Sequence, residues 1–149
     1  MDTKRLLLIA KVLLTIGALE FFGPIVRDTN STHLLNPEWV GHARVHLAWC
    51  LALWAILGAF SLYLIWGRKP LNFNQLYLAW GIQTMNVLAF WIAVALVPAY
   101  DGLITDPKTH ILIFGVDENV VAFTGFFLLS LSSFIVLKKL EARGEELPA

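Results

Sequence analysis

His42 and His46 are the two residues of this 149-residue chain whose type and spacing most directly suggest chemistry. Side chains four residues apart lie on one face of a helix, so both imidazoles can reach one metal ion. A carboxylate from another helix would complete a divalent metal site of this kind. The sequence offers Glu20, Asp117 and Glu118 for that position.

Proton transfer is the other chemistry that these side chains support. Histidine changes its charge near neutral pH, and a carboxyl group removed from water is costly to ionise. In this hypothesis His46 is a base or a ligand and Glu20 is an acid or an orienting group, acting on a small lipophilic molecule. We therefore predict Glu20 and His46 as catalytic residues, and His42 with His46 as metal ligands.

Further polar and aromatic residues are candidates for the same site. Asn86 lies within an apolar stretch, whereas Asp117 and Glu118 directly precede one. His110 is expected to lie on the surface. The predicted binding residues are Asp28, Asn30, His33, Trp39, Asn86, Asp117 and Glu118.

Each of these residues also has a structural explanation. The histidine pair suits the solvated start of a helix, and His33 suits a turn or a cap. Acidic residues such as Asp117 and Glu118 stabilise the positive N-terminal end of a helix. The structural explanation for Glu20 is pairing with His46 or Arg44.

Composition indicates a membrane protein. Hydrophobic residues make up 58% of the chain and charged residues 15%, against about 45–50% and 25% in soluble domains. The mean hydropathy is +0.68. The 11 basic and 11 acidic residues balance, so nothing indicates a nucleic-acid partner. The single cysteine, Cys50, lies in an apolar run, which excludes an internal disulfide and a cysteine-rich metal site.

Four stretches are long enough to cross a bilayer as helices, which takes about 20 apolar residues. We predict an all-α fold, an integral membrane four-helix bundle in which the helices run up and down. Residues 1–140 form its single domain, and residues 141–149 form a flexible cytoplasmic tail. The spans are expected at about 6–26, 44–66, 75–97 and 117–138.

Basic residues predict the orientation of the bundle. They gather at both termini and in the second connection, and the other two connections contain fewer. By the positive-inside rule both termini are cytoplasmic and the protein is a multi-pass protein of the cell inner membrane, with 27–45 and 98–118 outside. The residues that carry this prediction are Lys4, Arg5, Arg68, Lys69, Lys138, Lys139 and Arg143.

Depth along the helices brings the polar residues together in the outer half of the bilayer. Glu20 lies fourteen residues after Leu6, which is about 21 Å along a helix. We expect an outward-facing pocket that binds a small lipophilic molecule, such as a quinone or a lipid, or a divalent metal. Its expected residues are Glu20, His42, His46, Asn86 and Asp117 or Glu118.

Two other functions stay open. The protein is a non-catalytic subunit or assembly factor if its polar residues only hold helices together, within a homo-oligomer or a membrane complex. A small transporter is the third reading. Four spans are few for a transporter, and the sequence indicates no discontinuous helix.

The string D-x-N-x-T-H-x-x-N-P-x-W-x-x-H-A-x-x-H, from Asp28 to His46, resembles the signature of small four-span bacterial membrane proteins of uncharacterised function. The first span, LLLIAKVLLTIGALEFFGP, is similar to the opening helix of the DoxX-like group. The span count and the mixture of carboxylates with histidines also resemble the four-span sterol isomerases of the emopamil-binding type. The first resemblance implies that seven positions of this chain match the signature, and it assigns no role to any of them. These positions are Asp28, Asn30, His33, Asn36, Trp39, His42 and His46.

Overall fold

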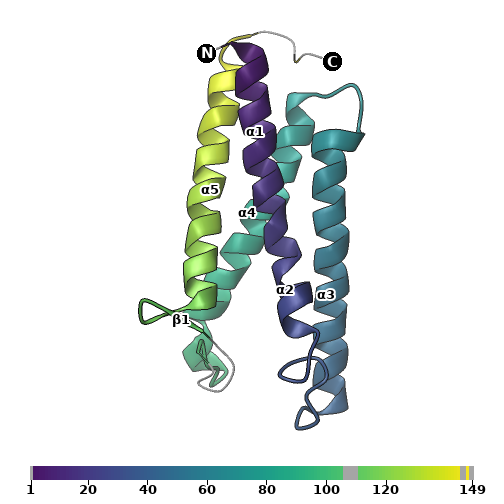
Figure 1. The fold of residues 1–149 in the computed structure, drawn as a ribbon, viewed down its shortest axis with the longest axis vertical. Coiled ribbons are helices and arrows are strands. Elements are labelled where there is room, and N and C mark those ends of the chain that lie inside the picture. Colours follow the sequence, from purple (N-terminus) through teal and green to yellow (C-terminus); the bar gives the residue numbers. More distant parts are fainter. Residues whose placement is uncertain (1, 106–110, 145–146, 148–149) are drawn as a thin grey trace.

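The computed structural model describes residues 2–105, 111–144 and 147, so His110 lies outside the described part of the chain. The described residues contain four helical segments that are long and apolar enough to cross a membrane, which confirms the predicted all-α membrane bundle. Successive segments run antiparallel, and the two termini lie at the same end (Figure 1). The segments are Thr3–Asp28, Gly41–Gly67, Phe73–Ala95 and Glu118–Glu141.

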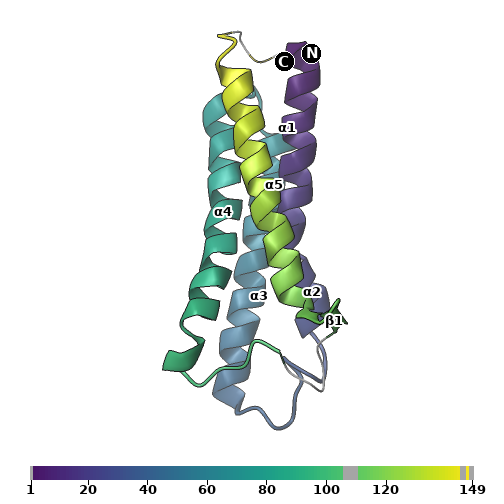
Figure 2. The same ribbon diagram turned by 90° about the vertical axis from the view of Figure 1, so that its left-hand side faces the viewer.

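We name the two ends of the bundle by what they carry. The terminal end carries both termini, and the loop end carries residues 29–40 and 96–105 (Figure 2). A core of buried aliphatic side chains fills the terminal half, where α1 packs most extensively against α5. Its members are Leu6, Leu7, Ala10, Leu14, Leu64, Ile65, Leu71, Leu76, Ala79, Leu137 and Leu140.

The first span changes helix type along its length. It consists of α1 (Thr3–Ala18), the 3₁₀ turn η1 (Leu19–Phe21) and the short helix α2 (Gly23–Asp28). Pro24 has no N–H, so it cannot donate the helical hydrogen bond to the carbonyl of Glu20 four residues earlier. The helical span therefore tightens into a 3₁₀ turn at Glu20 before it continues to Asp28.

The second and third spans have well-defined ends. Helix α3 (Gly41–Leu62) continues into the π-helical turn η2 (Tyr63–Gly67). Helix α4 (Phe73–Ala95) begins at a capping box, in which the Asn72 side chain accepts from the backbone N–H of Gln75 and the Gln75 side chain accepts from the backbone N–H of Asn72. The 3₁₀ turn η3 (Val97–Ala99) follows α4.

A small hairpin precedes the last span. Strands β1 (Leu112–Ile113) and β2 (Val116–Asp117) pair antiparallel, and α5 (Glu118–Glu141) begins directly after them. The helix ends three residues beyond the predicted limit of 138. The Glu141 carboxylate accepts a hydrogen bond from Tyr77 at 2.9 Å, so the first residue of the predicted tail belongs to the bundle.

Polar side chains join the helices within the bundle. Gln83 Nε2 of α4 donates to the backbone carbonyl of Leu14 in α1 at 3.0 Å. Gly17 makes this approach possible, because a Cβ there would overlap Gln83 Oε1. Thr84 Oγ1 and Ser130 Oγ lie 2.7 Å apart and join α4 to α5. Such interhelical bonds are the usual polar contacts in membrane bundles.

The outward faces of the spans carry exposed apolar side chains. Leu8, Ile56, Met85 and Leu128 are examples, one from each span. A soluble bundle would cover such residues with a second layer or replace them with polar residues. This surface is the one that a bundle embedded in lipid presents.

Candidate functional site

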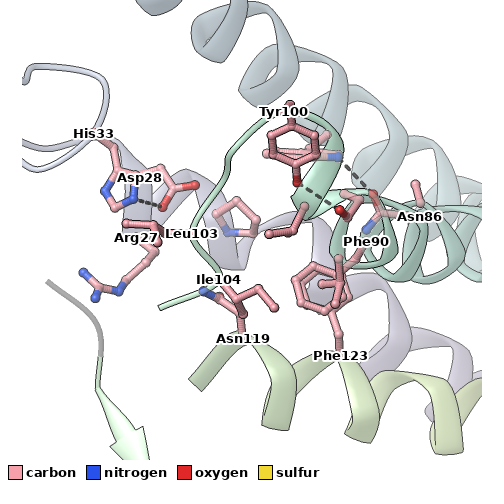
Figure 3. Close-up of a pocket in the computed structure, with 16 residues that line it drawn as sticks. Arg27, Asp28, His33, Asn86, Phe90, Tyr100, Leu103, Ile104, Asn119 and Phe123 are labelled. Atoms are coloured by element: carbon pink, nitrogen blue, oxygen red, sulfur yellow. Dashed lines mark hydrogen bonds and ion pairs between the residues drawn. The ribbon is translucent and has the colours of Figure 1, made fainter. Parts of the chain in front are cut away.

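A recess of about 520 Å³ opens at the loop end, between α2, α3, α4, α5 and the segment after α4 (Figure 3). Its walls are mostly apolar, and Phe90 of α4 stacks on Phe123 of α5 with ring centroids 4.0 Å apart. Tyr100 closes one side, and its hydroxyl donates to the Ala93 carbonyl at 2.9 Å. The recess therefore has the size and apolar lining of a small-molecule site.

Asn86 and Trp54 form a hydrogen-bonded pair in the recess wall. The Trp54 Nε1–H donates to Asn86 Oδ1 at 2.9 Å, which fixes the orientation of the Asn86 amide. A tryptophan in an apolar run carries no sequence signal for this role, so sequence analysis did not identify Trp54. Asn86 lies in the recess, as one of the predicted binding residues.

Glu20 lies behind this wall in the 3₁₀ turn. Its side chain is 3% exposed, and neither carboxyl oxygen has a hydrogen-bond partner. The Asn86 side chain lies near the carboxyl group, but the contact does not have the geometry of a hydrogen bond. A buried polar group without a partner is costly, so this carboxyl group is an unexplained feature of the bundle.

A second cavity of about 200 Å³ adjoins Glu20. It shares five lining residues with the larger recess, so the two spaces adjoin at the loop end. Glu20 thus borders the smaller space and Asn86 the larger one. The shared residues are Pro24, Arg27, Asp28, Asn119 and Phe123.

Charged residues stand at the mouth of the recess. Arg27 Nη2 of α2 lies 2.7 Å from Glu118 Oε1 of α5, and this ion pair links the two helices. His33 Nε2 lies 3.9 Å from Asp28 Oδ1 and forms an ion pair when the imidazole is protonated (Figure 3). Two pairs of predicted and unpredicted residues therefore lie at this end: Asp28 with His33, and Glu118 with Arg27, which the sequence analysis did not select.

Two other predicted binding residues shape the loop that carries His33. The Asn30 side chain accepts from the Thr32 backbone N–H at 2.8 Å and donates to the Arg27 carbonyl at 2.8 Å. The Trp39 ring packs edge-on against the His33 ring, with centroids 6.0 Å apart. Asn30 and Trp39 do not line the recess; they position His33.

Asp117 serves as the cap of α5. It is buried, and its carboxylate accepts from the Asn119 backbone N–H at 2.8 Å. This contact satisfies one of the free N–H groups at the helix start. Asp117 lines neither cavity, whereas its neighbour Asn119 lines both.

His42 and His46 lie away from the recess, on an exposed face of α3. Their Nε2 atoms are 3.0 Å apart, and the His46 ring stacks on Trp49. At 100° per residue, His42 points about 180° away from the buried Leu51, so α3 cannot turn both toward the interior. The structure therefore does not bring His42 or His46 to Glu20, contrary to the expected pocket.

A metal site would need more than this histidine pair. Among the described residues, no group of three or more His, Cys, Asp or Glu side chains is placed to hold a metal ion. Catalytic zinc sites have three protein ligands. Of the carboxylates expected to join the pair, Glu118 is paired with Arg27, Asp117 caps α5, and Glu20 lies behind Asn86.

The fold and composition together define a multi-pass, all-α membrane protein. No protein-family model, curated protein or solved structure matches the chain. The resemblances drawn from the Asp28–His46 string and from the first span stay predictions.

Proposed function

We propose that this protein binds a small lipophilic molecule, such as a quinone or a lipid, in the recess at the loop end. The observation that carries the proposal is the unpartnered carboxyl group of Glu20 beside a mostly apolar cavity. A ligand with one polar group could supply the missing hydrogen bond while its apolar part occupies the larger space. Asn86 would then hold the same polar group from the other side.

The arrangement also suits proton transfer to or from the bound molecule. Glu20 would exchange a proton with the ligand, because it is the buried acid nearest the cavity. The Asp28–His33 pair at the mouth would connect that proton with water. His33 thus takes the basic role that the sequence analysis assigned to His46.

The loop end would face the outside of the cell inner membrane, with both termini in the cytoplasm. The support is the distribution of basic residues, since Lys4, Arg5, Lys138 and Lys139 lie at the terminal end. Cytoplasmic ends of spans are rich in lysine and arginine. The recess would then exchange its ligand with the outer leaflet.

The test compares Glu20→Leu with the matched control Glu38→Leu, which changes an exposed glutamate in the loop before α3. Each purified protein is reconstituted in nanodiscs and titrated with decylbenzoquinone, and binding is followed by Trp fluorescence. The Trp54→Phe variant identifies the part of the fluorescence signal that comes from the recess. Molecules that co-purify are identified by mass spectrometry. We expect Glu20→Leu to weaken quinone binding or lipid retention at least tenfold, and Glu38→Leu to leave both unchanged.

A thermal melt of the same ligand-free proteins separates binding from structural roles. Removing an unsatisfied buried carboxyl group should leave the empty protein as stable as wild type or more stable. A clear loss of stability with unchanged ligand retention would overturn the proposal, as would a wild-type protein that retains and binds neither ligand.

The competing function is a non-catalytic subunit or assembly factor. Gln83, Thr84 and Ser130 favour it, because their bonds join helices and none of them lines the recess. A subunit should bring its complex from native membranes when it is purified in mild detergent. Purification of the chain alone, with a bound lipophile, would favour the binding function.

A further inference from the structure

The hairpin before α5 exposes apolar side chains that no part of the described structure covers. Residues 111–116 have the sequence ILIFGV and contain no charged or polar side chain. Phe114 at the tip is 102% exposed, and Ile111, Leu112, Ile113 and Val116 are also exposed. In Figure 1 the hairpin projects sideways from the first turn of α5, away from the bundle.

The backbone conformation at the tip of the hairpin is unfavourable for a bulky residue. Phe114 and Gly115 have φ angles of 51° and 81°, so both turn residues are in the left-handed region. Glycine adopts this conformation readily, whereas a bulky residue rarely does. Asn-Gly is the usual choice for such a two-residue turn. Phenylalanine here is unfavourable for the turn, and its ring is fully exposed among the described residues, so a contact outside them would explain its presence.

The base of the hairpin is fixed to the bundle. The backbone N–H of Glu118 donates to the Ile111 carbonyl at 3.0 Å, and the Ile111 N–H donates to Glu118 Oε1 at 3.3 Å. Glu118 is also paired with Arg27 of α2. The hairpin is therefore held at the level where the apolar span of α5 begins, beside the lipid-facing surface of that helix.

We propose that residues 111–116 anchor the loop end in the interfacial layer of the lipid bilayer, with Phe114 reaching toward the acyl chains. Continuity with the exposed apolar face of α5 favours lipid as the occupant. A six-residue hairpin offers far less than the roughly 800 Å² per partner of a standard protein interface. Its short strands leave backbone groups unpaired, which restricts it to the hydrated interface and excludes the bilayer core.

The test measures the depth of a nitroxide spin label in vesicles of phosphatidylcholine and phosphatidylglycerol. The label is placed by Phe114→Cys or Leu112→Cys in a Cys50→Ala background, which removes the exposed native cysteine. Glu38→Cys is the aqueous reference and Leu128→Cys, in the middle of α5, is the lipid reference. Collision rates with oxygen and with a water-soluble nickel chelate are compared.

We expect the oxygen-to-nickel ratio at position 114 to exceed that at position 38 at least threefold and to stay below that at position 128. A ratio equal to that at position 38 would overturn the proposal. Protection from both reagents would also overturn it, because a protein would then cover the hairpin. The spin-label result does not depend on ligand binding in the recess. The proposal of ligand binding and the proposal of lipid anchoring can therefore be refuted independently.

Discussion

Gly17→Ala tests the contact that sets the distance between α1 and α4 next to the recess. A Cβ at this position would overlap Gln83 Oε1 and lie 3.2 Å from Gln83 Cδ. The Gln83 amide would have to leave its place, and its 3.0 Å hydrogen bond to the Leu14 carbonyl would break. Gly17 lies three residues before Glu20, which borders the smaller cavity, and Gln83 lies three residues before Asn86, which lines the recess, so the same contact positions that pair.

The expected cost follows from the lost bond and from the group left behind. An interhelical hydrogen bond in a membrane protein contributes about 0.6 kcal/mol on average. A buried amide without a partner adds about 1 kcal/mol or more. We therefore expect Gly17→Ala to lower the free energy of unfolding by about 1–2 kcal/mol, a factor of about 5–30 in the unfolding equilibrium.

The assay is reversible unfolding in mixed micelles of mild detergent and dodecyl sulfate, followed by helical circular dichroism. Gln83→Ala removes the obstructing amide, so Gly17→Ala should cost less than about 0.5 kcal/mol in that background. Gly81→Ala is the control on α4, because nothing lies within 4 Å of a Cβ there. Equal costs for Gly17→Ala in both backgrounds, or no cost in wild type, would refute the reasoning.

Two further predictions concern other parts of the bundle. Thr84→Val and Ser130→Ala both remove the 2.7 Å hydrogen bond between α4 and α5. In the same unfolding assay, the double variant should therefore lose about 0.6 kcal/mol less stability than the sum of the two single variants. A loss equal to that sum would exclude the bond. In a Cys50→Ala background, a membrane-impermeant maleimide should label Asp101→Cys on intact cells and Lys69→Cys only after lysis, and the reverse pattern would contradict the proposed orientation.

The sequence alone was enough to predict the class of fold. Helices in lipid must satisfy their own backbone groups, so uninterrupted apolar runs of sufficient length identify spans without tertiary information. The predicted limits of 44–66 and 75–97 agree with Gly41–Gly67 and Phe73–Ala95 to within three residues. The residue count along the helices also indicated that Glu20 and Asn86 lie in the same half of the bundle, and their side chains lie near each other in the structure.

Rotation about each helix and the course of the loops required the tertiary structure. The rotation of α3 depends on how its small and large side chains pack against other helices, and that packing leaves His42 and His46 outside. The joining of Arg27 to Glu118, and of Trp54 to Asn86, links residues far apart in the chain. No local pattern specifies such a pair, because its energy exists only once the helices are packed.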